Sequence, residues 1–325
     1  MTLRSPKRLQ NVFPERWENF LRLLRDHVLE PTEAFPTVRC WTHSNLGHLI
    51  MEVVKGHPDQ LVPSTFCTAG EAIHRLMEMG WLKPISLGPV KDGITKMYFL
   101  EMEAREGEMI LDPLEVLQGF MPQGVLCYFG VLSYLELTTQ VPPFFHVAKM
   151  DKAPLPPEWS EPSSNQAGER RHLRNPMGTE LFRFEGAMCY QTRRNTMMVP
   201  GIQERVFGKR AKVRMTTLEQ TLLDTLIYPT QCGGQGVVFE AWERGVELWN
   251  PDRMAGYLEQ IGRPTFDRRV GAMLDVLGVK SVLSKKMENR LEVVRHDSEA
   301  SSEPISLING VDYPRLNKSW NVRIP

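Results

Sequence analysis

The spacing of apolar residues in the first third of the chain most strongly restricts the folds available to it. Apolar residues recur at helical intervals in three segments, and glycine ends the second and third of them, at Gly56 and Gly80. The three predicted helices are residues 15–29, 46–56 and 64–80. Two segments rich in β-forming residues follow, 81–87 and 94–100, on either side of a turn bounded by glycine. The sequence therefore predicts three helices and a β-hairpin.

This order of elements is typical of a winged helix-turn-helix domain, in which the third helix and the hairpin face DNA. We accordingly expect an α+β protein with an N-terminal winged helix-turn-helix domain over residues 1–105, including a basic N-terminal arm, and a mixed α/β C-terminal domain. A small α+β domain that binds protein has the same order of elements and is the alternative. The first 105 residues contain 13 basic and 12 acidic side chains, a weak bias for a DNA-binding domain.

Polar residues on the outward face of the third helix are candidates for reading DNA. Hydroxyl side chains bond bases or phosphates, arginine forks onto guanine, and glutamate accepts a hydrogen bond from cytosine. The candidates on this helix are Ser64, Thr65, Thr68, Glu71 and Arg75. The candidates for phosphate contacts at the hairpin tip and in the N-terminal arm are Lys91, Lys96, Arg4, Lys7 and Arg8. An ordinary solvated helix face and a disordered chain start are the alternatives.

The rest of the chain divides into three parts. Residues 106–150 indicate a connecting helical segment that ends in the first strand of the next domain, 144–148. Residues 151–176 contain five prolines and three serines with few large apolar residues, which predicts a long flexible loop. Residues 177–325 are the predicted C-terminal domain. Its predicted strands are 179–185, 206–215 and 291–294, and its predicted helices are 218–227, 237–244, 251–261 and 265–277.

The strongest local charge bias lies between Gln166 and Arg214, where eleven basic residues face four acidic ones. Placed on alternating strand positions, these cations would form one electropositive face that meets nucleic acid or an acidic protein. The alternative is a set of scattered solubilising arginines. The residues predicted to form this face are Arg183, Arg193, Arg194, Arg205, Lys209, Arg210, Lys212 and Arg214.

Sequence signatures of enzymes and metal centres are absent. The chain contains no G-x-x-x-x-G-K-[ST], G-x-G-x-x-G, G-x-S-x-G or H-E-x-x-H motif. Its five cysteines lie far apart without a C-x-x-C pair, which is typical of reduced thiols in a cytoplasm. His48 and Glu52 are four residues apart, but two ligands are too few for a metal site. We expect no catalytic residues, no metal and no cofactor.

Overall charge and hydropathy exclude further classes of protein. Lysine plus arginine equals aspartate plus glutamate at 39 each, so no global field draws the molecule onto nucleic acid or an anionic membrane. The chain has no run of about 18 consecutive apolar residues, and no apolar stretch of signal-peptide length follows the basic start. We therefore expect a cytoplasmic protein without a membrane partner.

Short motifs follow one another in a distinctive order in the second half of the chain. They are VRMTTLEQTLLD at 213–224, Tyr228-Pro229, Gly233-Gly234, VVFE at 237–240 and DRRVG at 267–271. In this order they resemble the AbiEi family, the antitoxins of type IV toxin–antitoxin systems. The segment 122–125 and the closing Trp320-Asn321-Val322 are also similar to that family. The chain departs from the family pattern at Gln220, where arginine is expected, and at Val270, where leucine is commoner.

The residues of these motifs also have structural interpretations. Thr217 is expected to cap a helix whose positive first turn holds Glu219, and leucines of this helix pack inward. Asp224 is expected to bond either the backbone or the pair of arginines in DRRVG. The motif residues assigned such architectural roles are Thr217, Glu219, Asp224, Gly233, Gly234, Arg268 and Arg269.

The resemblance implies a non-catalytic protein of phage defence. In that family an N-terminal winged helix binds inverted repeats in the promoter of its own operon and represses it, as a monomer in solution or paired on double-stranded DNA. The C-terminal domain acts as an antitoxin against a nucleotidyltransferase toxin without forming a stable complex with it. Two alternatives stay open from the residues alone: a nucleic-acid-processing enzyme delivered by the winged helix, and an adaptor that docks proteins.

Overall fold

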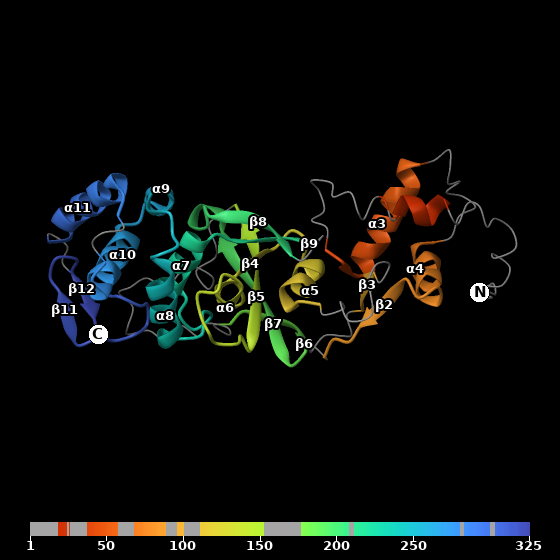
Figure 1. Cartoon of the computed structure of the whole chain (residues 1–325), viewed down its shortest axis with the longest axis horizontal. Coiled ribbons are helices and arrows are strands. Elements are labelled where there is room, and N and C mark those ends of the chain that lie inside the picture. The colour runs from red at the N-terminus through yellow and green to blue at the C-terminus, as the bar shows by residue number, and fades with distance from the viewer. Residues whose placement is uncertain are drawn as a thin grey trace, which may run out of the picture. The chain divides into compact units, whose positions relative to one another are not determined.

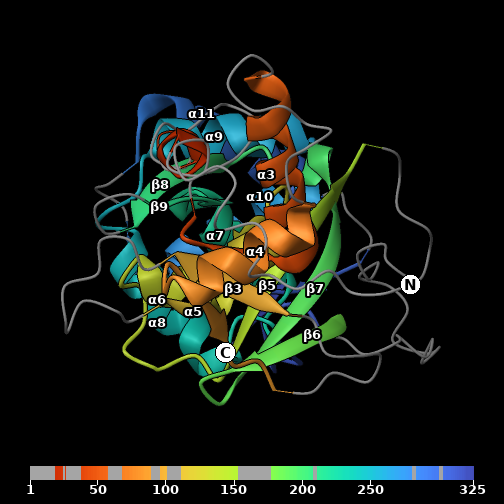
Figure 2. The same ribbon diagram turned by 90° about the vertical axis from the view of Figure 1, so that its right-hand side faces the viewer.

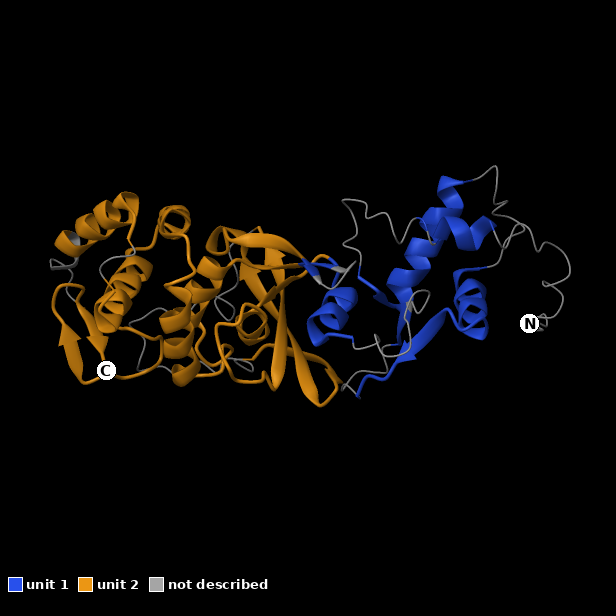
Figure 3. Cartoon of the chain, in the orientation of Figure 1, with its two compact units in different colours: residues 1–122, 206–213 blue, residues 123–205, 214–325 orange. Residues whose placement is uncertain are grey.

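The computed structural model describes residues 19–24, 26, 38–57, 68–88, 96–100, 111–152, 177–207, 211–279, 283–299 and 303–325. The chain forms two compact units, shown in Figure 3. The first contains Met1–Pro122 and Val206–Val213, and the second contains Gln123–Arg205 and Arg214–Pro325. Helices and strands occur in both units, which confirms the prediction of a mixed α+β protein.

The first unit combines helices with a small antiparallel sheet (Figure 1). Its elements after the helical residues 19–24 are β1 (Cys40–Thr42), α3 (His43–Gly56), α4 (Ala69–Glu78), β2 (Leu82–Ile85), β3 (Met97–Leu100) and α5 (Pro113–Phe120). The strands are hydrogen-bonded in the order β1-β3-β2, and both pairs are antiparallel. The two strands predicted after Gly80 are confirmed, whereas β1 was not predicted because three residues carry no measurable periodicity.

The helices α3 and α4 bury the apolar faces that their periodicity predicts. Thr42 caps α3, because its hydroxyl accepts a hydrogen bond from the amide of Asn45 at 3.1 Å. α4 begins at Ala69, later than the predicted start near Ser64, since Thr68 already has the extended backbone of a capping residue. The core of the unit contains Phe20, Leu21, Leu24, Trp41, Leu46, Leu49, Ile50, Val53, Val54, Ala72, Ile73, Leu76, Leu82 and Tyr98.

The helix α5 packs against β1 inside the first unit and does not act as a plain connector. Glu115, only 1% exposed, accepts hydrogen bonds from the Nε, Nη2 and backbone amide of Arg39 at 3.0, 2.7 and 2.9 Å. Gly119 lies so close to the backbone of Cys40 that no side chain fits there. α5 therefore belongs to the first unit, whose first segment ends at Pro122, within the segment 106–150 that the sequence treats as a connection.

A six-stranded mixed sheet dominates the start of the second unit, although Val206–Val213, which include parts of its last two strands, are assigned to the first unit. Its elements are β4 (Val125–Cys127), α6 (Phe129–Tyr134), β5 (Phe144–Asp151), β6 (Thr179–Phe184), β7 (Ala187–Asn195), the 3-10 turn η1 (Thr196–Met198), β8 (Ile202–Phe207) and β9 (Ala211–Thr216). The strand order is β6-β7-β5-β4-β9-β8. β6 and β7 form an antiparallel pair side by side (Figure 2), while β5 pairs with β7, and β4 with β9, in parallel. The predicted loop 151–176 falls almost entirely outside the described residues.

Five helices and a small sheet complete the second unit. They are α7 (Leu218–Ile227), α8 (Gln235–Gly245), α9 (Pro251–Ile261), α10 (Pro264–Leu277), α11 (Lys285–Glu299), β10 (Ile305–Ser306), β11 (Arg315–Asn317) and β12 (Val322–Ile324). The four predicted helices are confirmed, but the strand predicted at 291–294 is wrong because these residues belong to α11. Met287 and Leu291 are buried one helical turn apart, so the period of that segment is helical. None of the helices in the described ranges is long and apolar enough to cross a membrane.

Candidate functional site

The structure describes only part of the predicted DNA-contacting set. Thr68, Glu71, Arg75 and Lys96 lie within the described ranges. Lys96 is exposed directly before β3, and its backbone carbonyl accepts a hydrogen bond from the amide of His43 at 2.9 Å. The candidates that lie outside the described residues are Arg4, Lys7, Arg8, Ser64, Thr65 and Lys91.

Thr68 and Glu71 bind each other at the start of α4. The Thr68 hydroxyl accepts a hydrogen bond from the Glu71 amide at 3.3 Å, and the Glu71 carboxylate accepts one from the Thr68 amide at 2.7 Å. This reciprocal capping box satisfies two amides that a helix start otherwise leaves free. Both side chains are exposed, so they lie at the surface of α4 while performing a local structural task.

The exposed face of α4 carries charges of both signs. Arg75 is half-buried in the last turn, where its carbonyl accepts a hydrogen bond from the amide of Met79 at 2.9 Å. His74 and Glu78 are exposed, and the His74 Nε2 lies 3.3 Å from a carboxylate oxygen of Glu78. The face is therefore polar and accessible without being strongly basic.

The predicted basic face of the C-terminal domain is interrupted by burial. Arg194 is 3% exposed and pairs with Asp224 inside the core, so it takes no part in a solvent-facing surface. Its neighbour Arg193 is half-buried and binds both carboxylate oxygens of Asp151 at 3.0 Å. The two side chains differ because successive residues of a strand point to opposite faces.

Four further cations of the predicted basic face lie within the described residues, on three strands. Arg183 on β6 and Arg205 on β8 are exposed. Lys212 and Arg214 on β9 are half-buried, and the Nη1 of Arg214 donates to the carbonyl of Gln123 at 3.4 Å. The other two predicted members, Lys209 and Arg210, lie outside the described residues.

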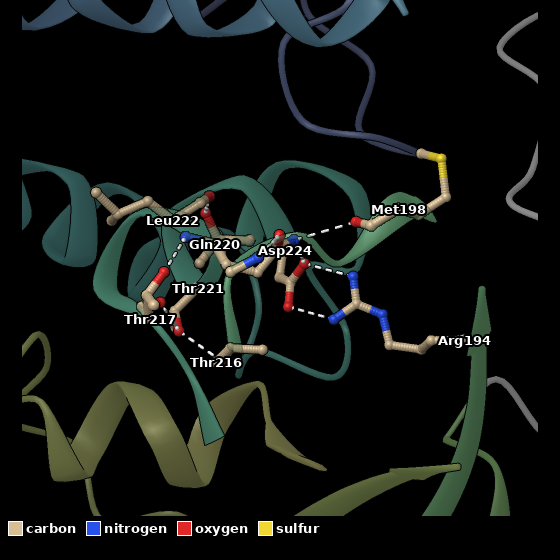
Figure 4. A network of polar contacts seen from close by, with 10 residues as sticks. Arg194, Met198, Thr216, Thr217, Gln220, Thr221, Leu222 and Asp224 are labelled. Atoms are coloured by element: carbon tan, nitrogen blue, oxygen red, sulfur yellow. Dashed lines mark hydrogen bonds and ion pairs between the residues drawn. The ribbon is translucent and has the colours of Figure 1, made fainter. Parts of the chain in front are cut away.

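The most unusual chemistry of the second unit is a buried ion pair between β7 and α7 (Figure 4). The Nη1 and Nη2 atoms of Arg194 donate to the two carboxylate oxygens of Asp224 at 2.5 and 2.6 Å. The guanidinium carbon also lies 5.4 Å from the ring centre of Tyr128 and 5.3 Å from that of Tyr228, which is cation–π distance. Tyr128 has a φ of 64°, in the left-handed region that non-glycine residues rarely occupy. The Arg194 guanidinium thus contacts two aromatic rings and binds both carboxylate oxygens of Asp224.

Gln220 connects this ion pair to the chain that precedes α7 (Figure 4). Its Nε2 donates to the Asp224 carboxylate at 2.9 Å and to the Met198 carbonyl at 3.3 Å. Its Oε1 accepts a hydrogen bond from the buried Gly201 amide at 3.3 Å. Gly201 itself lies against Tyr257, Thr217 and Gln220 with no room for a side chain. Gln220 therefore joins the ion pair on α7 to the segment 198–201.

Threonine hydroxyls pair with further polar groups on and beside α7. Thr216 and Thr221 share a hydrogen bond of 2.8 Å, and the Thr221 hydroxyl also bonds the Thr217 carbonyl at 2.7 Å. The indole of Trp242 donates to the Thr225 hydroxyl at 3.0 Å. α7 is consequently a polar helix inside a core, which a structure tolerates only when its polar groups are paired.

Burial controls the titration of the groups beside this network. It lowers the pKa of His146 to about 3, so this imidazole is neutral, and its Nε2 donates to the Met177 carbonyl at 3.0 Å. Burial also raises the pKa of the Cys127 and Cys232 thiols. Both cysteines are fully buried and protonated, so they are poor nucleophiles. The arrangement is suited to holding β7 and α7 together.

The family-motif residues have the architectural roles that the sequence suggests, with one correction. Thr217 caps α7, because its hydroxyl accepts a hydrogen bond from the Gln220 amide at 3.3 Å. The carboxylate of Glu219, which is 2% exposed, accepts a hydrogen bond from the Asn250 amide at 2.8 Å. The expectation that Asp224 bonds backbone or the arginine pair of α10 is wrong, because Arg194 and Gln220 are its partners.

The two consecutive arginines of α10 instead hold the end of the chain. Arg268 donates to the carbonyls of Trp320 and Asn321, with 2.7 Å to the former. Arg269 donates to the Ser306 carbonyl at 2.9 Å. Arginine is suited to this task because its fixed fork of donors matches several acceptors at once.

The glycine pair between α7 and α8 is required by backbone geometry. Gly233 and Gly234 have φ values of 93° and 92°, which side chains disfavour. A Cβ atom at Gly233 would also lie 2.7 Å from the ring of Phe129. This glycine pair therefore allows the turn into α8 and a close aromatic contact.

Sequence reasoning missed the residues that surround the ion pair. Tyr128 and His146 lie outside every motif, and the motifs that contain Tyr228 and Gln220 do not show what these side chains contact. A buried arginine in a strand also cannot be distinguished from an exposed one by its identity alone. A signal was nevertheless present: the TTLEQTLLD segment places a carboxylate and an amide four residues apart on a helix rich in leucine. Two such polar groups on one face imply a buried partner.

Comparisons with known proteins leave the chain unassigned. No family model and no curated protein matches it. A solved structure titled "Crystal structure of RV2827C protein from Mycobacterium tuberculosis" covers 94% of this chain and 90% of its own length, with 14% identity and a TM-score of 0.47. A likeness this distant assigns neither a family nor a function.

Proposed function

We propose that this protein is a DNA-binding autorepressor and the antitoxin of a type IV toxin–antitoxin operon. The observation that carries the DNA-binding part is the arrangement of the first unit. There, the helices α3 and α4 precede the β2–β3 hairpin, and β1 adds to the same antiparallel sheet. Such a unit places α4 in a major groove and the hairpin beside it.

Accessible polar groups on α4 support this assignment. Thr68 and Glu71 at its start are exposed, and Arg75 is partly so. Arg75 is the candidate for reading a guanine, and Lys96 before β3 is a candidate for a phosphate contact. The nearly balanced charge of this unit predicts modest binding to random DNA, so operator binding depends on base contacts.

The antitoxin part rests on the motif order in the second unit. The segment from Thr217 to Asp224, the glycine pair and the arginine pair are the positions that resemble the AbiEi family. In this chain the first two sets lie on or directly after α7, and the arginine pair bonds carbonyls of residues 306–321, so we assign these residues structural roles. We assign the suppression of a nucleotidyltransferase toxin to the surface of the unit. No cofactor, metal or membrane is part of this proposal.

Fluorescence anisotropy of the full chain tests the DNA-binding part. The titration uses DNA from upstream of its own gene and scrambled DNA between about 50 and 200 mM salt, where each phosphate contact adds about 0.9 to the log–log slope. We expect sequence-dependent binding, and Arg75→Ala should weaken operator binding by about 1–3 kcal/mol if Arg75 bonds a guanine. Lys55→Ala, at the opposite end of α3 from its Thr42 cap, is the matched control.

The outcomes separate the roles clearly. Equal loss on both DNAs would make Arg75 a phosphate contact, and no loss would remove it from the interface. Equally weak binding of the parent chain to both DNAs would contradict the repressor proposal and indicate protein docking. For the antitoxin part, the readout is rescue of cells that express a nucleotidyltransferase encoded in the same operon, which this proposal requires, and the Arg75 variant should still rescue.

A further inference from the structure

A pocket of about 510 Å³ lies among the last three long helices of the second unit. Its volume is within the range of about 300–1,000 Å³ that small-molecule sites occupy. Gly262 at the end of α9 and Pro264 at the start of α10 form one side, and α11 forms the other. The side chains that α11 contributes are Lys286, Asn289, Arg290, Val293 and Val294.

Arg290 is positioned in this pocket by a buried carboxylate. Asp267, 2% exposed, accepts hydrogen bonds from the Arg290 Nε at 2.5 Å and Nη2 at 3.1 Å. These bonds occupy one edge of the guanidinium, and Nη1 on its other edge has no bonded partner among the residues that the structure describes. A guanidinium held in this way presents its second edge to a carboxylate or phosphate.

The rest of the α11 face supplies a second cation and an apolar surface. Lys286, Asn289, Arg290 and Val293 occupy positions i, i+3, i+4 and i+7 of α11, so they share one side of the helix. Lys286 lies 3.6 Å from Glu259, but both side chains are more than half exposed and such a pair is weak. Val293 is 62% exposed, although most of this helix is charged. Cationic donors and exposed apolar surface therefore lie together.

We propose that this pocket binds a small organic anion, an apolar ring or chain that carries one carboxylate or phosphate group. Arg290 and Lys286 bind the anionic group, and Val293 with Pro264 contacts the apolar body. Glu259 and Asp267 lie in the same pocket and repel further negative charge, so ligands with several phosphates are disfavoured. This site is independent of the DNA-binding proposal, because every residue that lines it belongs to α9, α10, α11 or their connections.

Isothermal titration of the full chain tests this site with four probes. Benzoate and phenyl phosphate carry both required groups, inorganic phosphate carries only the anion, and benzyl alcohol carries only the apolar ring. We expect saturable binding of benzoate or phenyl phosphate at one site per chain, and the stronger of the two identifies the preferred anion. Inorganic phosphate and benzyl alcohol should each bind about tenfold more weakly or not at all, since each lacks half of the contacts.

Variants then locate the binding on α11. Lys286→Gln and Val293→Ser change exposed side chains, so the fold is expected to survive, and each should weaken binding several-fold. Arg290→Lys keeps the charge beside Asp267 but removes the fork, and it should weaken binding about tenfold. Arg295→Gln, on the same helix but outside the pocket, is the control. The proposal is overturned if no probe binds saturably, if inorganic phosphate binds as well as phenyl phosphate, or if all three pocket variants bind like the parent.

Discussion

The helices α4 and α7 begin with the same chemistry and use it differently. Each is capped by a threonine and carries a glutamate or glutamine three residues later, Thr68 with Glu71 and Thr217 with Gln220. In α4 the Glu71 carboxylate returns to the Thr68 amide and closes a local capping box. In α7 the Thr217 amide donates to the Gly201 carbonyl at 3.0 Å, so Gln220 turns away and binds distant groups.

Exposure explains this difference. Water surrounds the start of α4, so a local bond is sufficient and both side chains remain at the surface. Nine of the ten residues of α7 are buried, so every polar group there needs a protein partner. The same four-residue pattern therefore stabilises a surface helix in the first unit and joins α7 to the segment 198–201 in the second.

Breaking the ion pair beside Gln220 should have the largest effect of any change to either helix. Arg194→Met leaves the Asp224 carboxylate buried without its partner, so we expect a loss of about 3–5 kcal/mol in the free energy of unfolding. Urea denaturation followed by circular dichroism measures it. Arg193→Met, whose partner Asp151 is half-buried, is the control and should lose about 1 kcal/mol or less. The double variant Arg194→Met/Asp224→Leu should recover part of the loss. Equal losses in Arg194→Met and Arg193→Met would contradict the expected difference between a buried and a half-buried ion pair.

Removing the amide of Gln220 should have the next largest effect. Gln220→Leu leaves the Gly201 amide buried without an acceptor, which costs about 1–3 kcal/mol in the free energy of unfolding. Glu71→Leu removes the corresponding side chain of α4, where water replaces the lost bond, and its loss should be clearly smaller. The same urea experiment compares them. A Glu71 variant that is as unstable as the Gln220 variant would show that both glutamate and glutamine act as simple caps.

Removing the cap of α4 should destabilise the first unit by about 1 kcal/mol. Thr68→Ala takes away the hydroxyl that accepts the Glu71 amide, whereas Thr68→Ser keeps it. Thermal unfolding of both variants, together with their binding to the proposed operator, separates capping from DNA contact. If Thr68 acts only as a cap, affinity for the proposed operator measured well below the melting temperature will be unchanged in Thr68→Ala.

The smallest expected effect concerns Glu240 on α8, whose ionisation contributes to the pH dependence of the free energy of unfolding. Hydrogen bonds from Thr138 and Thr139 hold the pKa of Glu240 below its ordinary value, because they favour the ionised form. The stabilisation is therefore complete above the ordinary glutamate pKa and is lost as the pH falls through the lowered value. We expect Glu240→Gln to reduce this acid-dependent part by no more than about 1 kcal/mol. Unfolding curves at pH 7 and at about pH 3 check it, and identical pH dependence in both proteins would contradict the assignment.

Much of the fold follows from the sequence because periodic patterns report local burial. The faces of α3, α4, α9 and α10 are visible as apolar residues three and four apart. By contrast, β1 is too short to show a period. Residues 291–294 of α11 were predicted as a strand because the run LEVV is rich in β-forming residues, and Met287, one helical turn earlier, was not considered. Sequence patterns report which residues are buried within an element more reliably than which kind of element it is.

The candidate site was harder to predict because its partners are far apart in the chain. Arg194 and Asp224 are 30 residues apart and meet only when β7 lies beside α7. Because the prediction rested on the number of charges between residues 166 and 214, it assigned Arg194 to a basic surface. The start of α4 was predicted near Ser64, ahead of the observed start at Ala69, although the capping box of Thr68 and Glu71 that marks it is encoded entirely within four consecutive positions.

The central strands of the large sheet have a consequence for how the protein folds. β4 pairs in parallel with β9 through Leu126 and Met215, although most of the sheet lies between these residues in the sequence. The chain must close this long loop before the pairing can stabilise anything, and distant pairings of this kind slow folding. The small sheet of the first unit joins residues 40–100 and needs only shorter loops. After dilution from denaturant, native structure should accordingly form first around α3 and α4 and last around the β4–β9 pair.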